Sequence, residues 1–176
     1  MSGHNKWSQI KRQKEKTDGA RSQVFAKFGK LIADEARKAK GDMNAPALKT
    51  AIERAKASNM PNDNIERALK KATADKAGAM ESIIYEAYGP GGCAMIIEIL
   101  TANRNKAAQE VKFILSKNGY ALAGIGAAAW AFEKKDGVWS PTTTVPLSED
   151  DLIKLEALVN ELENNEEVQE VYCNVQ

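Results

Sequence analysis

The side chains that most often carry catalysis or hold metal ions are few in this 176-residue sequence and lie far apart. His4 is the single histidine, and Cys93 and Cys173 are the two cysteines. A structural zinc site needs about four Cys or His ligands at short spacings, and these three residues offer no such set. Catalysis by histidine would need an imidazole held in a packed cleft, whereas His4 stands in an unpatterned segment. We therefore expect no enzyme activity, no metal site and no cofactor.

The remaining patterns with chemical potential have ordinary structural interpretations. The carboxylates of SEDD and ENNEE stand at the ends and faces of expected helices, where solvated charge is the default. No Walker motif or dinucleotide fingerprint is present. GPGG at 89–92 could present backbone amides to a phosphate, but the alternation on both sides favours a turn between two strands.

The charges are divided unevenly along the chain, although the net charge is only +1. Residues 1–78 carry 18 Lys and Arg against 9 Asp and Glu, a net charge of +9, whereas residues 79–176 carry 7 against 15, a net charge of −8. A basic segment joined to an acidic body is typical of a protein that binds a polyanion. The alternative is that the two halves dock on each other, but docking does not require an unpatterned basic tail.

Residues 1–20 are predicted to form a flexible basic tail, because they show neither a helical nor a strand period. Such a tail is expected to become ordered on binding, with its cations on phosphates and its indole stacked on an unpaired base. The candidate nucleic-acid contacts in the tail are His4, Lys6, Trp7, Lys11, Arg12 and Lys14. Two alternatives remain: Trp7 pins the tail onto a helical bundle, or the charges form a solvated tail with no partner.

Residues 21–78 predict a small three-helix module with a basic exterior. Apolar residues recur at three- and four-residue spacing over 21–40, 46–57 and 62–73. Gly41 and Asp42 end the first segment, and the stretch SNMP at 58–61 ends the second.

A polar cluster, NMPNDNIERALKK at 59–71, begins at the second of these breaks. A well-capped helix connection explains part of it but not the crowding of amide and basic side chains, which are groups that contact phosphates and base edges. The candidate contacts here are Asn59, Met60, Pro61, Asn64, Arg67 and Lys70, together with Lys27 on the outer side of the first helix.

Residues 79–176 predict an α+β module. Strands are expected over 83–88, 94–100, 127–132, 138–145 and 168–175, with helices over 105–118 and 149–162. From residue 94 the order is strand, helix, strand, strand, helix, strand, which is the order of the ferredoxin-like sandwich, with residues 83–88 as an additional strand. The predicted fold is therefore α+β: an N-terminal three-helix module followed by a ferredoxin-like α/β sandwich.

The expected location is the cytoplasm, with no membrane partner. The sequence has no apolar run of 18 residues, and its first residues lack the apolar core of a signal peptide. Two cysteines suit a reducing compartment. Because no symmetric dimer seam is visible in the sequence, we expect a monomer.

Four long blocks of the sequence resemble the YebC/PmpR family, which includes the mitochondrial translational activator of cytochrome oxidase subunit one. They are GHNKWSQIK at 3–11, AIERAKASNMPNDNIERALKKA at 51–72, YEAYGPGGCAMIIEILTANRNKAAQEVKFILSKNG at 85–119 and VPLSEDDLIKLEALVNELENNEEVQEVYCNV at 145–175. The resemblance implies a helical domain followed by α+β domains, without enzymatic activity. Some family members resemble DNA-binding transcriptional regulators, whereas others act on ribosomes and assist synthesis of proline-rich stretches that stall peptide-bond formation.

The resemblance adds a third candidate contact region, a loop for RNA or a protein partner made of Gly91, Gly92, Asn103, Arg104 and Asn105. Typical family members also carry a third domain inserted within the second. Here a short hairpin, KKDGVW at 134–139, stands where that insertion should leave. The chain is thus divided into a tail (1–20), a helical module (21–78) and an α+β module without the inserted domain (79–176).

These observations lead to a non-enzymatic, nucleic-acid-binding regulator of gene expression. The leading hypothesis is a translation factor that binds the ribosome or another structured RNA. The first rival is a transcriptional regulator on duplex DNA, for which the helix at 62–73 is the candidate reader. The second rival is an interaction protein whose halves bind each other or an acidic protein.

Overall fold

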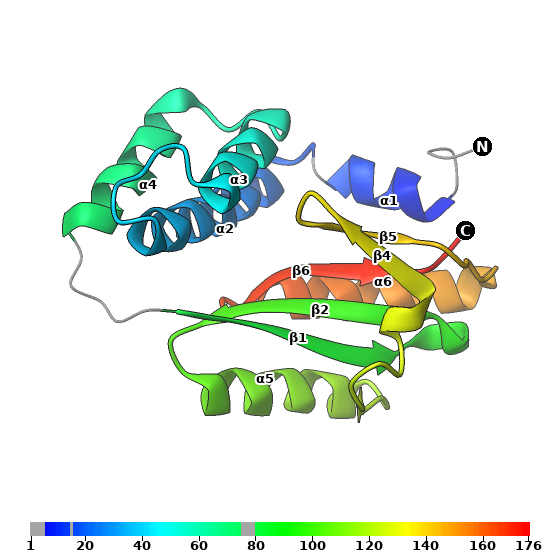
Figure 1. Ribbon diagram of the computed structural model, residues 1–176. Coiled ribbons are helices and arrows are strands. Elements are labelled where there is room, and N and C mark those ends of the chain that lie inside the picture. Colours follow the sequence, from blue (N-terminus) through cyan, green and yellow to red (C-terminus); the bar gives the residue numbers. More distant parts are fainter. Residues whose placement is uncertain (1–5, 15, 75–79) are drawn as a thin grey trace. The chain divides into compact units, whose positions relative to one another are not determined.

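The chain forms two compact units, which are described separately (Figure 1). The computed structural model describes residues 6–14, 16–74 and 80–176, without the side chains of Arg12 and Lys14. Residues 15–80 make up the helical unit, and residues 1–14 and 81–176 together make up the sheet unit. The N-terminal segment therefore belongs to the same unit as the C-terminal half of the chain.

Over its described residues, the helical unit consists of three helices around an alanine-rich core. These helices are α2 (Asp18–Lys38), α3 (Pro46–Ala57) and α4 (Asn62–Ala74), as the apolar spacing predicts. The Thr17 side chain accepts a hydrogen bond from Ala20 N, so α2 starts with a side-chain cap and begins three residues earlier than expected. Both α3 and α4 pack against α2, and their shared core includes Ile32, Leu48 and Ile65.

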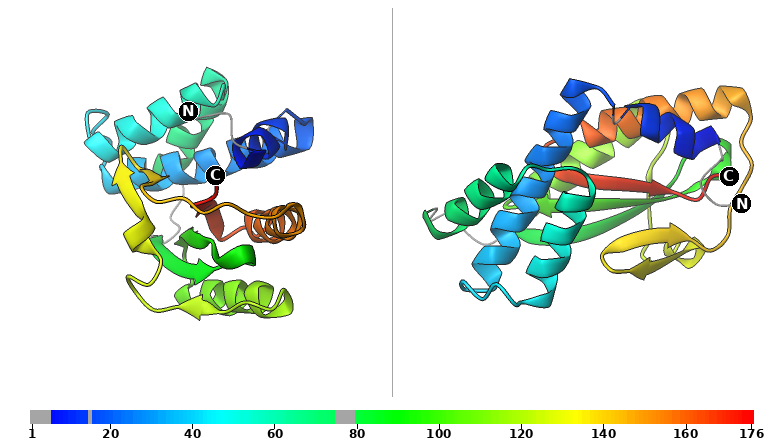
Figure 2. Two further views of the ribbon diagram at one scale, coloured as in Figure 1. Left: turned by 90° about the vertical axis from the view of Figure 1, so that its right-hand side faces the viewer. Right: turned by 90° about the horizontal axis from the view of Figure 1, so that it is seen from above.

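The sheet unit is a two-layer sandwich with its helices on one face of an antiparallel sheet (Figure 2). The strand order is β3 (Leu122–Ala123), β1 (Glu81–Tyr88), β2 (Ala94–Thr101) and β6 (Val168–Cys173). Alternate residues of β2, such as Ile97 and Ile99, join a core with α5 (Arg104–Lys117) and α6 (Glu149–Glu163). The α+β class and the order of helices before sheet are thus confirmed.

The strand assignment differs from the prediction, first in the hairpin at residues 132–141. The strands β4 (Phe132–Lys135) and β5 (Val138–Pro141) form a separate hairpin, so they do not join the main sheet as a ferredoxin-like order from residue 94 would require. The strand predicted as additional, β1, is instead central in the sheet. Asp136 and Gly137 have φ values of 51° and 77°, which fits the predicted two-residue hairpin turn.

The segment predicted as a strand at 127–132 is mostly a loop followed by a short 3-10 helix, η2 (Ala129–Ala131). Its backbone donors bind a carboxylate instead of a neighbouring strand. The buried Glu86 side chain of β1 accepts hydrogen bonds from the backbone N of Gly126 at 2.7 Å, Ala128 at 2.7 Å and Ala129 at 2.8 Å. Amides in and beside the predicted strand are therefore satisfied by one side chain 40 to 43 residues away in sequence.

The predicted flexible tail is wrong over residues 6–14, which form the helix α1 (Lys6–Lys14) of the sheet unit. Trp7 is 6% exposed and belongs to the same buried cluster as residues of β2, β6 and α6. Lys6 Nζ lies 3.0 Å from Glu149 Oε1, and Lys11 Nζ donates to the backbone oxygen of Val171 at 2.9 Å. Lys11 of this helix thus satisfies a backbone oxygen of β6, the outer strand of the sheet, where edge backbone groups need partners.

We predict that Trp7→Ala destabilises the sheet unit by about 3–5 kcal/mol, because a buried indole is lost and a cavity remains. Chemical denaturation followed by circular dichroism measures this change. Trp7→Phe, which keeps an aromatic ring, should cost clearly less. Unchanged stability of Trp7→Ala together with weaker RNA binding would contradict the buried position and restore the stacking hypothesis.

We predict that Glu86→Gln destabilises the sheet unit by roughly 2 kcal/mol at neutral pH, because a charged acceptor of three N–H groups is replaced by a neutral amide. Burial acts to raise the pKa of Glu86, but the three backbone donors outweigh it and the pKa lies below its ordinary value of 4.5. The wild-type advantage is therefore fully present above about pH 4.5 and is lost as the pH falls through the lower folded-state pKa.

Denaturation at a series of pH values tests this linkage, with Glu133→Gln on the exposed side of β4 as the matched control. A Glu86→Gln deficit that grew on acidification would have the wrong sign.

Candidate nucleic-acid interface

The two units carry net charges of opposite sign. The difference between these charges is smaller than the difference between residues 1–78 and residues 79–176. The helical unit has 14 Lys and Arg against 9 Asp and Glu, a net charge of +5, and the sheet unit has 11 against 15, a net charge of −4. Four basic residues of the N-terminal segment account for the change from +9 and −8, because they belong to the acidic unit. A basic surface for a polyanion must therefore be sought on the helical unit itself.

The turn between α3 and α4 has a regular helix-ending geometry. Asn59 has a φ of 63°, and its backbone N donates to Lys56 O, while Met60 N donates to Ala55 O at 3.0 Å. These two bonds form a Schellman motif, in which the residue after Asn59 usually makes an apolar contact. Met60 is 6% exposed and part of the core, so the prediction that it contacts nucleic acid is wrong.

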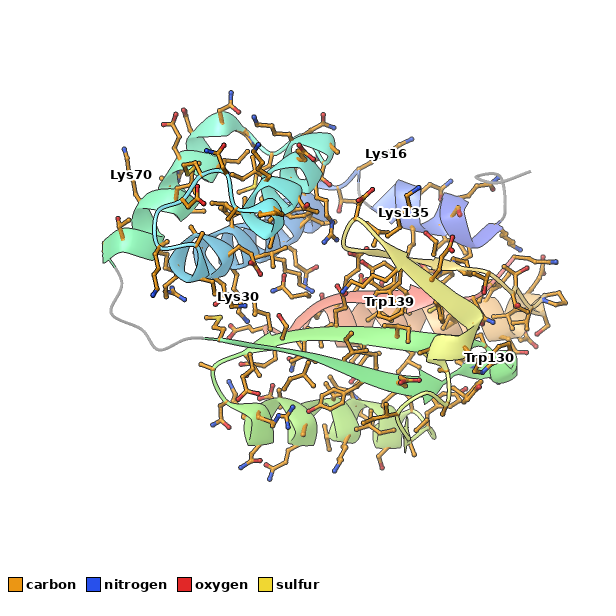
Figure 3. The ribbon with its side chains drawn as sticks, viewed as in Figure 1. Lys16, Lys30, Lys70, Trp130, Lys135 and Trp139 are labelled. Atoms are coloured by element: carbon orange, nitrogen blue, oxygen red, sulfur yellow. The ribbon has the colours of Figure 1, made fainter. Side chains whose placement is uncertain are left out.

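The first turns of α4 present basic and amide side chains to solvent. The buried residues Ile65, Ala68 and Ala72 form the inner face of the helix, which leaves Arg67, Lys70 and Lys71 exposed. Arg67 donates from Nη2 to Asn64 Oδ1 at 2.9 Å and from Nε to Asp63 O at 3.4 Å. Figure 3 shows Lys70 extending away from the helix.

Three further predicted residues of this cluster fall on or near the same helix. Asn59 and Pro61 are exposed in the turn, and Asn64 is half-buried on the first turn of α4. Lys71 was not among the predicted contacts, yet its spacing of four residues from Arg67 places it on the same surface. We call the exposed residues Asn59, Pro61, Arg67, Lys70 and Lys71, together with Asn64, the α4 surface.

Lys27 lies on α2, where it is half-buried and interacts with neighbouring groups. Lys16 and Lys30 also belong to the helical unit (Figure 3). These lysines add to the positive potential of the unit. They lie on α2 or, for Lys16, just before it, and not on α4. The predicted contacts at 59–71 that are exposed thus lie together on and before α4, whereas Lys27 lies on α2.

Two cations of the helical unit are used internally. Asp34 of α2 is 1% exposed, with Lys38 Nζ at 2.6 Å and Arg37 Nη1 at 3.6 Å from its carboxylate oxygens. Burial acts to lower the pKa of Lys38, but the hydrogen bond and charge of Asp34 outweigh it and raise the pKa above its ordinary value. Arg37 and Lys38 therefore compensate a buried charge, so a phosphate would have to compete with Asp34 for them.

The predicted tail contacts are placed differently from the α4 surface. Lys6 and Lys11 are bonded within the sheet unit and Trp7 is buried there, which contradicts the stacking role predicted for this indole. The Trp7 result supports a staple, although it pins the segment to the sheet unit and not to the helical bundle. His4 and the side chains of Arg12 and Lys14 lie outside the described residues.

The third predicted region is not one loop. Gly91 and Gly92 precede β2, whereas Asn103, Arg104 and Asn105 follow it, so the two groups lie about 25 Å apart at opposite ends of an eight-residue strand. The β2 strand separates them because it is fully extended between its neighbours.

Each of these two groups also has a structural explanation. A Cβ at Gly91, whose φ is +67°, would come within 2.3 Å of Leu147 Cδ2, so the turn needs glycine there. The Asn103 side chain accepts from Lys106 N at 3.1 Å and caps α5, and Arg104 Nε lies 3.3 Å from Glu81 Oε2. Asn105 is exposed.

Among the described residues, no group of three or more His, Cys, Asp or Glu side chains is placed to hold a metal ion. Within the same ranges, no helix is long and apolar enough to cross a membrane.

Two family models match the chain. One, described as the TACO1/YebC protein N-terminal domain, matches residues 5–75. The other, described as the TACO1/YebC second and third domain, matches in two segments, 80–138 and 136–175, which meet at the β4–β5 hairpin.

Relatives and a solved structure agree with these matches. A "probable transcriptional regulatory protein" from Petrotoga mobilis is 45% identical over 97% of this chain and 69% of its own length. Another of that name, from Pelotomaculum thermopropionicum, is 50% identical over 77% of this chain and 56% of its own length, so the chain spans only part of these relatives.

The crystal structure of a conserved hypothetical protein, Aq1575 from Aquifex aeolicus, superposes with a TM-score of 0.78 at 28% identity, covering 98% of this chain and 97% of that one. Family models over nearly the whole chain, close relatives and a shared fold lead to one conclusion: the chain belongs to the TACO1/YebC family.

Proposed function

We propose that this protein is a non-enzymatic regulator of gene expression that binds nucleic acid through its helical unit, with the ribosome or another structured RNA as its target. The observation that carries the proposal is the α4 surface, where Arg67, Lys70 and Lys71 stand exposed on a unit of net charge +5. In this role it assists synthesis of proline-rich sequences that stall translation, as the family resemblance implies, and works in the cytoplasm as a monomer.

The composition of the α4 surface suits contacts to a phosphate backbone. Exposed Lys and Arg side chains release counterions when they neutralise phosphates, and amide side chains add hydrogen bonds to phosphate and sugar. The Asn64 side chain holds the Arg67 guanidinium at 2.9 Å, which limits the rotamers that Arg67 must lose on binding. The acidic sheet unit repels polyanions, so it is suited to position the protein or to contact a protein partner.

A second candidate function is regulation of transcription on duplex DNA. Two observations favour it: relatives carry the name probable transcriptional regulatory protein, and α3 and α4 are joined by a four-residue turn of the length found in helix-turn-helix motifs. In that motif the second helix, here α4, would read the major groove. We also propose that the chain lacks a domain that longer family members insert at the β4–β5 hairpin.

A competition experiment tests the proposal. Purified protein is bound to intact ribosomes at physiological salt and challenged with duplex DNA at matched phosphate concentration. We predict that the ribosomes retain the protein. Displacement by DNA in proportion to phosphate would favour the transcriptional alternative, and failure to bind either polymer would contradict nucleic-acid binding altogether.

The same assay is repeated with Lys70→Gln/Lys71→Gln, which should bind ribosomes more weakly and reduce the slope of log affinity against log salt by about 1.4–1.8, because two phosphate contacts are lost. Lys112→Gln/Lys154→Gln is the matched control, since it removes the same charge from exposed positions on the sheet unit. Equal effects of the two variants would show that net charge, and not the α4 surface, governs binding.

A further inference from the structure

We infer that the loop at residues 124–130 is a protein-docking site, which packs Ile125 and Trp130 against an uncharged, apolar segment of a partner protein. This site belongs to the sheet unit and is independent of the α4 surface. The inference rests on what the loop exposes, on how firmly it is held and on its lack of charge.

The loop exposes two large apolar side chains only five residues apart in sequence. Ile125 is completely exposed and Trp130 is 60% exposed. Single exposed apolar residues are common on protein surfaces and need no explanation. A tryptophan that stays exposed while its loop is tied to the core is a different case, because exposure is then built into the fold.

Backbone and side-chain bonds hold this loop in one conformation. Three of its amides donate to the buried Glu86 carboxylate at 2.7–2.8 Å. The indole Nε1 of Trp130 donates to Tyr88 Oη and to Ala127 O, both at 2.9 Å, and Tyr88 Oη donates to Ala127 O. The polar edge of the ring is satisfied within the protein, so the part of the indole that faces solvent is apolar.

Such an arrangement is favourable for binding. Tryptophan is enriched among the residues that contribute most to protein interfaces, and a side chain fixed before binding loses little conformational entropy. The bonds from Trp130 and Glu86 therefore hold the ring in place for contact with an apolar segment of the partner.

The charge of the segment indicates which class of macromolecule fits. Residues 118–132 contain no charged side chain, and the flanking Lys117 is already paired with Glu161. A nucleic-acid site would need cations beside the stacking ring to neutralise phosphates. An uncharged loop that presents an indole and an isoleucine instead matches an uncharged, apolar protein surface.

The neighbourhood of the loop gives a separate reason for a protein occupant. Ala128, Ala129 and Ala131 pack in one cluster with Trp139 of the β4–β5 hairpin. The two matched segments of the family model for the second and third domain meet at this hairpin, and the relatives are longer than this chain. The additional residues of longer members would therefore be inserted close to the loop at 124–130, which is exposed in this protein.

The test uses the full chain and a phage-displayed library of random twelve-residue peptides. Enriched peptides are synthesised, and their affinities are measured by fluorescence anisotropy for the wild type and for Ile125→Ser/Trp130→Ala. We expect enriched peptides to be apolar and uncharged, and to bind the double variant at least about tenfold more weakly. Ile125→Asp, at a fully exposed position that leaves the Trp130 bonds intact, should also weaken binding while the circular dichroism spectrum is unchanged.

The matched control is Phe113→Ser/Ile153→Ser, which removes two apolar side chains that are 67% and 66% exposed on α5 and α6. It should leave peptide affinity unchanged. The inference is overturned if no peptide depends on the loop, or if the control variant weakens binding equally. It is also overturned if the loop variant instead loses affinity for single-stranded poly(U), or loses self-association in sedimentation.

Discussion

The burial of Trp7 is the contact on which the distribution of charge in this protein depends. Because the indole lies in the core of the sheet unit, four basic residues of the N-terminal segment belong to the acidic unit, whose net charge is therefore −4 and not −8. The chain then enters the helical unit after residue 14 and leaves it before residue 81, so both ends of that unit are connected to the sheet unit. The helical unit keeps a net charge of +5, and the α4 surface presents three of its exposed cations.

Much of the fold could be predicted from local patterns. The predictions that failed share one physical cause, which is a contact between residues far apart in the sequence. The three-residue and four-residue apolar spacing located α2, α3 and α4, and the Asp-Gly pair located the β4–β5 hairpin. Glu86 shows what local patterns miss: its carboxylate binds amides at 126–129, so a segment that reads as a strand becomes a loop. Trp7 is a second example, since nothing near it in sequence indicates a core that begins at Ile83.

The candidate site could be predicted only where its residues share one helix. Arg67 and Lys70 were found because a helix places residues at fixed spacing on one face, which a sequence alone reveals. Met60 was misassigned because the Schellman motif that buries it depends on the backbone geometry of Asn59. The prediction placed Gly91 and Asn103 in one loop. The extended strand β2 lies between them and holds them apart.

The central claim is that Trp7 anchors α1 to the sheet unit while the helical unit binds nucleic acid. A variant with Trp130→Phe and Trp139→Phe leaves Trp7 as the single tryptophan of the chain. Its fluorescence should have the blue-shifted maximum of a buried indole, and this maximum should not change when ribosomal RNA saturates the protein. A red shift or strong quenching on RNA binding would contradict the claim, because it would show the indole leaving the core to meet the RNA.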